Sequence, residues 1–381
     1  MTRDLRVLSF ALLAWGIGEA FFIYTQTLYL ASLGADPVAI GGILAIASLV
    51  MTLSHIPAGL LADRIGSKPI ILVNWVFSLA AAGLMYLAQS LSVFTIGIVL
   101  YNLTGFVLSP LSVHITAARG NWTSARALTT VFAMFNIGGF IGSTLGWLMG
   151  EALTLRGGYG AALIAFAIST LSVFLISDQT IEHRELAGDV AALTGRKELI
   201  RFFGLAALIL FGAFLSWPLT ANYLQEIRGV STDTIRLFGA FNSLGMATLS
   251  LWMGRLESRK GIQTGQVLIG VSTALLWLGR NGLVFGAGYF LEGSFRAMRS
   301  LLASRVENLV SPRNRGLAFG ILETLSGLTL TITPIAAGIL YDSSPASPYP
   351  VSLGIILLTI LLAHHWMDAH LQEPTLARSE P

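Results

Sequence analysis

The chain has 381 residues, of which 54% are hydrophobic and only 11% are charged, whereas soluble domains carry about 25% charged residues. A soluble fold of this length could not hide so much apolar surface, so we expect lipid to be the solvent for most of the chain. The net charge of +3 comes from bases scattered over short segments, which argues against nucleic-acid binding, and the absence of cysteine excludes a disulfide framework and thiolate metal sites.

Apolar runs long enough to cross a bilayer recur along the whole chain. A helical span needs roughly 20 residues. The runs are continuous and do not alternate, so they predict helices and not barrel strands. The first run follows two basic residues, contains Glu19 and has no clear cleavage pattern, so we interpret it as a retained span and not as a signal peptide. The predicted spans lie near residues 7–31, 38–61, 69–89, 92–117, 127–150, 158–177, 202–225, 235–253, 263–279, 283–304, 316–340 and 351–367.

The distribution of Lys and Arg predicts the orientation of these spans. With the N-terminus in the cytoplasm, seventeen of the 23 bases fall in inner segments and two fall well within a span. The other four fall on the outer side, namely Arg156, Arg228 and Arg280 in loops and Arg236 at the outer end of its span. The positive-inside rule therefore places both termini in the cytoplasm. We expect a multi-pass protein of the inner or plasma membrane, in contact with the lipid bilayer and monomeric.

The longest polar stretch, residues 178–201, divides the twelve spans into six and six. Weak matches relate the two sets: "GLLADRIG" at 59 resembles "GRLESRKG" at 254, and "YNLTG" at 101 resembles "YFLEG" at 289. Two halves of the same topology are typical of transporters with parallel repeats. The sequence therefore predicts a six-helix bundle over residues 1–177, a cytoplasmic linker over 178–201 and a second six-helix bundle over 202–381 with a short tail.

The segment "GLLADRIGSKP", residues 59–69, is a charged turn between spans two and three. We expect Gly59 and Gly66 to form the turn and Pro69 to restart a helix. Asp63 would lie at the end of span two, where the N-terminal end of another helix favours an anion. Arg64 and Lys68 would face the cytoplasm, which a simple positive-inside anchor also explains.

The full pattern of this segment resembles the signature Gly-x-Leu-Ala-Asp-Arg-x-Gly-x-Lys of the major facilitator superfamily. "SPRNRGLAFG" before span eleven and "TPIAAGILYD" at its far end also resemble this family, and the similarity covers all twelve spans. The resemblance implies two six-helix bundles that rock about a central site and give alternating access. It further implies that the acid at position 63 locks the cytoplasmic side against the start of span eleven, marked by Gly316.

One position departs from the pattern of the proton antiporters in this family. Many of them carry an arginine in span four, four residues before a glycine. Here Gly105 is present, but Tyr101 takes the place of the arginine. The glycine-rich segment of span five, "GGFIGSTLGWLMG", also lacks the proline of that subgroup.

An acid near the middle of span one needs a reason, because an ionised side chain at mid-membrane costs about 2.5–3.5 kcal/mol on insertion scales. Trp15, Glu19, Phe22 and Gln26 recur at spacings of four, three and four, which places them on one helical face. An acid among aromatic rings suits an amphipathic or cationic substrate. Burial also favours the neutral form of a carboxyl group, so we expect Glu19 to be the site of proton coupling. A buried acid bonded to a neighbouring helix is the alternative.

Span ten carries three ionisable residues on one face, Glu292, Arg296 and Arg299. We expect Glu292 and Arg296 to pair along the helix. Arg299 would extend to the cytoplasm, bind an anionic substrate or pair with Glu323 of span eleven as a gate.

Other polar residues in the spans suggest a cavity. Single asparagines, Asn102, Asn136, Asn222 and Asn242, fall in spans four, five, seven and eight, where they line a polar cavity or hold helices together. His55 and His114 lie near inner ends, where a lone histidine is more often a hydrogen-bonding residue than a proton relay. We expect no cofactor, because the sequence has no phosphate-binding loop, and no metal, because its histidines form no ligand pattern.

These features favour a transporter over an enzyme, since no nucleophile constellation is present. We expect a secondary transporter that is driven by protons and exports an amphipathic or cationic small molecule. The alternative substrate is an organic anion held by Arg296 and Arg299. A membrane sensor that retains the fold without transporting is the alternative from another class; the short tail after the last span speaks against it.

Overall fold

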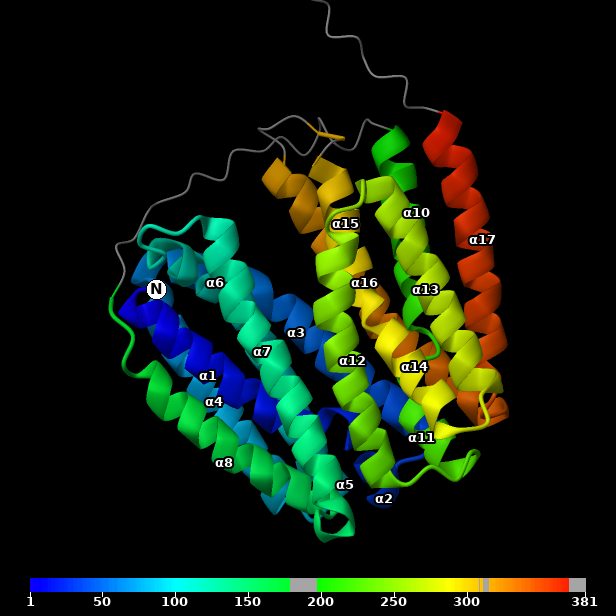
Figure 1. The fold of residues 1–381 in the computed structure, drawn as a ribbon, viewed down its shortest axis with the longest axis horizontal. Helices are drawn as coiled ribbons and strands as arrows, with labels where there is room; N and C mark the ends of the chain where they lie inside the picture. The colour runs from blue at the N-terminus through cyan, green and yellow to red at the C-terminus, as the bar shows by residue number, and fades with distance from the viewer. Residues whose placement is uncertain (179–196, 308, 311–314, 370–381) are drawn as a thin grey trace, which may run out of the picture.

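The computed structural model describes residues 1–178, 197–307, 309–310 and 315–369. These residues form helices, turns and short connections, with no strand among them. Figure 1 shows the helices in two groups, with most of α1 to α8 on one side and most of the later helices on the other. Seven of the described helical segments are both long and apolar enough to cross a membrane, judged by length and composition.

The first half contains six spans. Span one consists of α1 (Arg3–Ala20), the 3-10 turn η1 (Ile23–Thr25) and α2 (Gln26–Ser32). Span four consists of α5 (Leu91–Leu103), the turn η2 (Thr104–Val107) and α6 (Leu108–Ala117). The remaining elements are α3 (Pro37–Ile65), α4 (Ser67–Leu87), α7 (Ser124–Leu148), the turn η3 (Gly150–Ala152) and α8 (Leu155–Val173).

The second half repeats this order. Span seven consists of α10 (Lys197–Phe214) and α11 (Thr220–Glu226), and span ten consists of α14 (Gly282–Glu292) and α15 (Ser294–Glu307). The uninterrupted helices are α12 (Thr232–Met253), α13 (Ser258–Leu278), α16 (Arg315–Ser343) and α17 (Pro348–Ala369). All twelve predicted spans are therefore confirmed as helical, and the all-α fold of two six-span halves is correct.

Four of the described spans are interrupted, which the sequence analysis did not predict. Spans one, four, seven and ten, the first of each successive group of three, are interrupted. Gly105 lies within the interruption in span four, and Gly293 lies between α14 and α15. Pro218 follows α10, and a proline has no backbone N–H to continue a helix. Span one breaks without either residue type, so its interruption has no sequence signal.

The charged turn between α3 and α4 is shorter than predicted. The helix α3 continues through Gly59 to Ile65, so Gly59 is a helical residue and not part of the turn. Gly66 alone makes the turn, with φ of 88°, a left-handed conformation that favours glycine. Helix α4 begins at Ser67, with Pro69 in its first turn, as expected.

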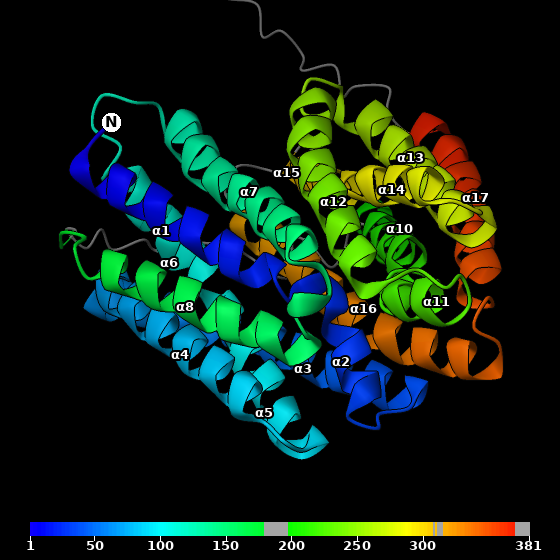
Figure 2. The ribbon, with the colours of Figure 1, turned by 60° about the horizontal axis from the view of Figure 1, so that its bottom comes forward.

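The two halves meet along two antiparallel helix pairs, α7 with α12 and α3 with α16. A Cβ on Gly41 of α3 would lie 2.3 Å from the carbonyl oxygen of Pro334 in α16, so the two backbones touch there. In α7, Gly139 lies against Ser243 of α12, and Gly146 lies against Arg236. Figures 1 and 2 show α7 and α12 side by side at the ends where α7 finishes and α12 begins, with the halves diverging toward the ends where α1 starts and α12 finishes.

The linker predicted for residues 178–201 falls largely outside the described residues, which end at 178 and resume at 197. Helix α10 begins at Lys197, five residues before the predicted start of span seven. The division at 178–201 stays a prediction.

Close packing of α1 on α7 gives a stability prediction. A Cβ on Gly138 would lie 2.2 Å from the carbonyl oxygen of Leu13, so Gly138→Ala must push the two backbones apart. We expect it to destabilise the protein by about 1–3 kcal/mol, the usual cost of overpacking, measured by thermal unfolding in detergent. Gly204→Ala in α10, where a Cβ would meet nothing within 4 Å, is the control and should leave the melting temperature unchanged or slightly raised.

Candidate functional site: a cavity between the halves

A cavity of about 690 Å³ lies between the two halves, with walls formed by both. Most of its lining comes from the interrupted spans one, seven and ten together with α7 and α12. The polar and charged lining residues are Glu19, Tyr24, Asn136, Asn242, Ser243, Glu292, Arg296, Arg299, Ser300 and Glu323. The aromatic lining residues are Tyr24, Phe135, Phe214, Trp217 and Phe295.

Glu19 lies in the last turn of α1, half-buried in the cavity wall. Its carboxyl group is within hydrogen-bonding reach of the Tyr101 hydroxyl group, which also accepts a hydrogen bond of 3.2 Å from Trp15 Nε1. Arg296 of the other half acts on Glu19 electrostatically, but the two form no ion pair within 4 Å. Tyr101, in the place of an arginine, thus leaves Glu19 without a base from its own half.

Arg296 projects from α15 across the cavity to α7. Its Nη1 donates a hydrogen bond of 3.3 Å to Asn136 Oδ1, and its guanidinium carbon lies 5.9 Å from the centre of the Phe135 ring. A guanidinium at that distance from an aromatic face gains a cation–π contact. Arg296 therefore links the two halves at the level of the cavity.

The predicted pairing of Glu292 with Arg296 is wrong. The i, i+4 rule needs one continuous helix, but α14 ends at Glu292 and α15 begins at Ser294, after the break at Gly293. Glu292 is 6% exposed and contacts Ser272 of α13, whose hydroxyl oxygen lies 3.4 Å from Glu292 Oε2. The same hydroxyl group donates to the carbonyl oxygen of Gly288 at 2.7 Å. Because a serine hydroxyl group has one hydrogen, its hydrogen bond to Glu292 is weak.

Arg299 and Glu323 form an ion pair between α15 and α16, which confirms one of the three expectations for Arg299. Both residues belong to the second half, so the pair does not join the halves. His55 of α3 lies within electrostatic range of this pair. The pair leaves Arg296 as the cavity base without an ion-pair partner among the described residues.

The four asparagines divide into two groups. Asn136 and Asn242 line the cavity, and Asn242 Oδ1 accepts a hydrogen bond of 3.1 Å from the Tyr24 hydroxyl group of the first half. Asn102 bonds the carbonyl oxygen of Ile98 on its own helix. Asn222 is buried between α11 and α2, where it donates to the carbonyl oxygen of Thr27 at 3.4 Å. Asn102 and Asn222 are therefore outside the cavity lining.

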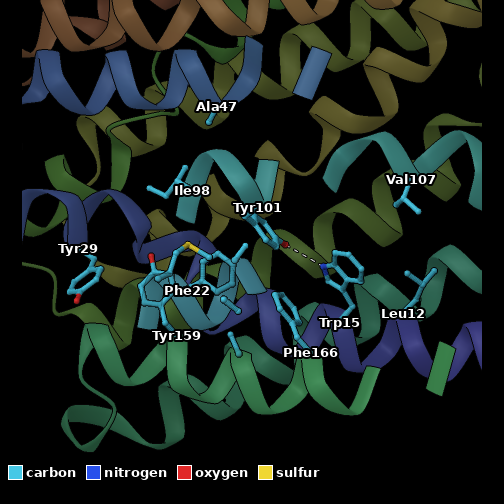
Figure 3. Close-up of a cluster of buried hydrophobic side chains, with 14 of the residues drawn as sticks. Leu12, Trp15, Phe22, Tyr29, Ala47, Ile98, Tyr101, Val107, Tyr159 and Phe166 are labelled. Atoms are coloured by element: carbon cyan, nitrogen blue, oxygen red, sulfur yellow. Dashed lines mark hydrogen bonds between the residues drawn. The ribbon is translucent and has the colours of Figure 1, made fainter. Parts of the chain in front are cut away.

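Trp15, Phe22 and Gln26 are also placed behind the cavity wall. Figure 3 shows Trp15 and Phe22 in an aromatic cluster with Tyr101 and Phe166. Phe22 is fully buried, with its ring centre 5.4 Å from that of Tyr101, and Gln26 is 5% exposed. The prediction that these three share a cavity face with Glu19 is corrected. The helix break after Ala20 ends the regular spacing before Phe22 and Gln26, and Trp15 packs on Trp75 and Phe166 of its own half.

The described charged side chains of this turn, Arg64 and Lys68, lie outside the cavity lining. Lys68 forms an ion pair of 3.3 Å with Asp178, and Arg64 is exposed. The side chain of Asp63 lies outside the described residues, and Gly316 is described only as part of the first turn of α16. The latch therefore stays a prediction.

His114 has a structural place at the inner end of the first half. It is buried, with Nε2 3.5 Å from Asp4 Oδ2 and Nδ1 3.1 Å from the Ser67 hydroxyl oxygen. The Ser177 backbone N–H also donates to Asp4. These contacts tie α1, α4 and α6 to the segment after α8, as expected of a hydrogen-bonding histidine.

Sequence reasoning missed several cavity residues, among them Tyr24, Phe135 and Trp217. Tyr24 lies in the turn η1, and Trp217 lies in the segment between α10 and α11. The pair "WP" at 217–218 was a signal for the second break, since proline interrupts helices. Phe135 precedes Asn136 in an apolar run and had no signal of its own.

Comparisons with known proteins agree with this architecture. The family model described as Major Facilitator Superfamily matches the chain in two segments, residues 7–193 and 202–380. The quinolone resistance protein NorA of Staphylococcus aureus (strain N315) is 21% identical over 373 residues, covering 95% of this chain and 96% of that protein.

Solved transporter structures share the fold. A crystal structure of the nucleoside transporter NupG matches with a TM-score of 0.73 and 15% identity, over 96% of this chain and 97% of that chain. The human organic anion transporter MFSD10 (TETRAN) matches with a TM-score of 0.65 and 17% identity, over 95% and 99% of the two chains. Together with the two-segment match of the family model, these similarities show that the chain belongs to the Major Facilitator Superfamily and is a membrane transporter.

Proposed function

We propose that this transporter exports an amphipathic, cationic small molecule in exchange for protons, with Glu19 as the coupling site. Export in exchange for protons needs a cavity that opens to one side at a time and an acid that can take up and release a proton within it. The substrate needs an apolar wall and an acidic group. The cavity between the halves has both an acidic group and an apolar wall.

The observation that carries the proposal is the combination of charges and rings in the cavity. Glu19 and Glu292 line it, and neither forms an ion pair within 4 Å among the described residues. Rings of Phe135, Phe214 and Trp217 lie in the same lining. Aromatic faces attract cations, and an unpaired carboxylate adds a charge contact in a site of low dielectric constant. The printed name of NorA, a resistance protein, also suggests export.

The direction of opening supports a transport cycle. The lining extends along α15 from Phe295 to Ala303, toward the side where α1 begins. With the predicted orientation, this side is the cytoplasm, and we therefore infer an inward-open state. We propose that the halves rock about α3, α7, α12 and α16 to open the cavity on the other side, with residues 178–201 as the linker.

Arg296 favours a second candidate, an organic anion. Among the described residues it is the cavity base without an ion pair, and a guanidinium binds carboxylates in a bidentate manner. The name of the neighbour MFSD10, an organic anion transporter, agrees with this candidate. However, Arg296 already contacts Asn136 and Phe135 and is attracted electrostatically by Glu19. An anion would have to compete with these interactions.

Equilibrium binding to the purified protein separates the two candidates. The probes are tetraphenylphosphonium, an amphipathic cation, and anilinonaphthalene sulfonate, an amphipathic anion. We expect saturable binding of the cation that Glu292→Gln weakens by about tenfold, roughly 1.4 kcal/mol. A bound cation would favour the ionised form of the buried Glu292, and the amide cannot supply that charge contact. Saturable binding of the anion alone, lost in Arg296→Gln, would replace the proposal by the second candidate.

The predicted latch gives a separate expectation for Asp63. If its carboxylate holds the start of α16 near Gly316 when the cytoplasmic side is closed, Asp63→Asn should leave the binding affinity for the probe unchanged and slow turnover, by about tenfold. Substrate flux in liposomes and equilibrium binding measure the two effects. Unchanged flux would remove the latch, and lost affinity would place Asp63 in the binding site.

A further inference from the structure

A buried arginine lies where the halves meet, at the end opposite the cavity opening. Arg236 is in the second turn of α12, and its side chain is 1% exposed. Its Cδ atom lies 3.1 Å from the position that a Cβ on Gly146 of α7 would take. The sequence placed Arg236 at the outer end of its span, but the side chain crosses from the second half onto the first.

The guanidinium group is poorly compensated for its burial. Nη2 donates one long hydrogen bond of 3.4 Å, to the carbonyl oxygen of Thr154, and Nε is buried without an acceptor. Asp233, one turn earlier, acts on Arg236 electrostatically, but no carboxylate of the described residues lies within 4 Å of it. Burial of a cation is expensive unless a carboxylate and further acceptors satisfy it.

Because of the position of Arg236, the free-energy cost of burying its charge applies to one conformational state. Helices α7 and α12 are antiparallel, with Gly139 against Ser243 near the cavity and Gly146 against Arg236 farther out. A pocket of about 470 Å³ with Arg236, Asp233 and Glu151 in its lining adjoins this outer contact. In the alternating access proposed above, opening of the outer side separates α7 from α12 at this contact and gives water and these two acids fuller access to the guanidinium group.

We propose that Arg236 opposes closure of the outer side, so that the cost of burying its charge in the inward-open state drives the transporter back toward the outward-open state. This proposal rests on the alternating access of the proposed function, but on neither its substrate nor its proton coupling. An ordinary gate contact stabilises the closed side. Because Arg236 is poorly paired, we expect it to destabilise the closed outer side instead.

The test replaces the charge while keeping the volume. Arg236→Met retains an unbranched side chain against Gly146 and needs no acceptor, and Arg236→Lys keeps the charge as the control. The chain has no cysteine, so introduced cysteines carry spin labels without further changes. The outer pair is Gln89→Cys with Arg280→Cys, and the inner pair is Asn121→Cys with Arg255→Cys; all four residues are exposed.

Distance distributions between the spin labels, without substrate, measure the ratio of outward-open to inward-open molecules. We expect Arg236→Met to lower this ratio by about tenfold, with short outer and long inner distances, and Arg236→Lys to resemble the parent. A higher ratio in Arg236→Met would show an ordinary closing contact, and identical distributions would show no role; either result overturns the proposal. If Arg236→Met does not fold, Arg236→Gln, also neutral, takes its place with the same expectation.

Discussion

Glu19→Gln is expected to remove the response of substrate flux to an imposed pH step while retaining exchange down a substrate gradient. The amide cannot take up or release a proton, so the pH-driven component should fall by about tenfold or more. The variant should fold, because a neutral amide costs less in a low-dielectric wall than a carboxylate. Glu19 is in the cavity lining, near Tyr101 and Arg296, so the change acts where substrate and proton would meet.

The measurement is flux into liposomes with and without a pH step, with Glu323→Gln as the matched control. Glu323 also lines the cavity, but it is already paired with Arg299 within the second half. The control should therefore keep its response to the pH step. If Glu19→Gln responds as the parent does, the proton role passes to Glu292, Glu323 or the histidines His55 and His114.

Arg296→Met is expected to destabilise the protein more than Arg299→Met. Arg296 links the halves through Asn136, Phe135 and the charge of Glu19, whereas Arg299 pairs with a Glu323 side chain that is 53% exposed. We expect a loss of about 1–2 kcal/mol for Arg296→Met, less than for a fully buried pair because Arg296 is exposed in the open cavity and Glu19 is only half-buried. For Arg299→Met we expect about 0–1 kcal/mol, as for exposed ion pairs.

Double variants identify the partner of Arg296. Glu19→Gln should recover part of the stability lost in Arg296→Met, because the two charges attract across the interface between the halves. Glu292→Gln combined with Arg296→Met should be additive within about 0.5 kcal/mol, because these residues do not pair. Thermal unfolding of the six proteins measures both. Recovery by Glu292→Gln instead of Glu19→Gln would contradict the geometry described above.

The twelve spans were predictable because lipid requires long apolar runs, and those runs are continuous in the sequence. The predicted start of span two, residue 38, is one residue from the start of α3 at Pro37. The interruptions were harder to predict. Gly293 and Pro218 mark two of them, but nothing in the residues after Ala20 marks the break in span one.

The charged residues of the cavity were predictable, because an ionisable side chain within a membrane span is costly and therefore indicates a functional site. Glu19, Glu292 and Arg296 were identified on that ground and do line the cavity. The aromatic residues were not, because a side chain such as Phe22 is equally suited to the cavity, the protein interior and lipid. Periodicity placed Phe22 and Trp15 beside Glu19, but the packing of the first half buries them against Phe166.

Pairings between segments far apart in the chain had almost no sequence signal. The contact of Arg296 with Asn136 depends on how α15 faces α7, and the sequence suggested the local partner Glu292 instead. Arg236 was counted as an outer charge because it lies near the end of a span, whereas the structure buries it against α7. The pattern of charges along one helix does not predict which residues of the other half that helix will contact.

Uptake of tetraphenylphosphonium into liposomes that contain the purified protein and are acidic inside tests the central claim most directly. Potassium with valinomycin holds the membrane potential at zero, so that only the proton gradient can drive uptake. We predict that the cation accumulates above its outside concentration, that dissipating the proton gradient abolishes the accumulation, and that Glu19→Gln lacks it. Equal cation uptake with and without the proton gradient, or accumulation of anilinonaphthalene sulfonate in its place, would contradict the account.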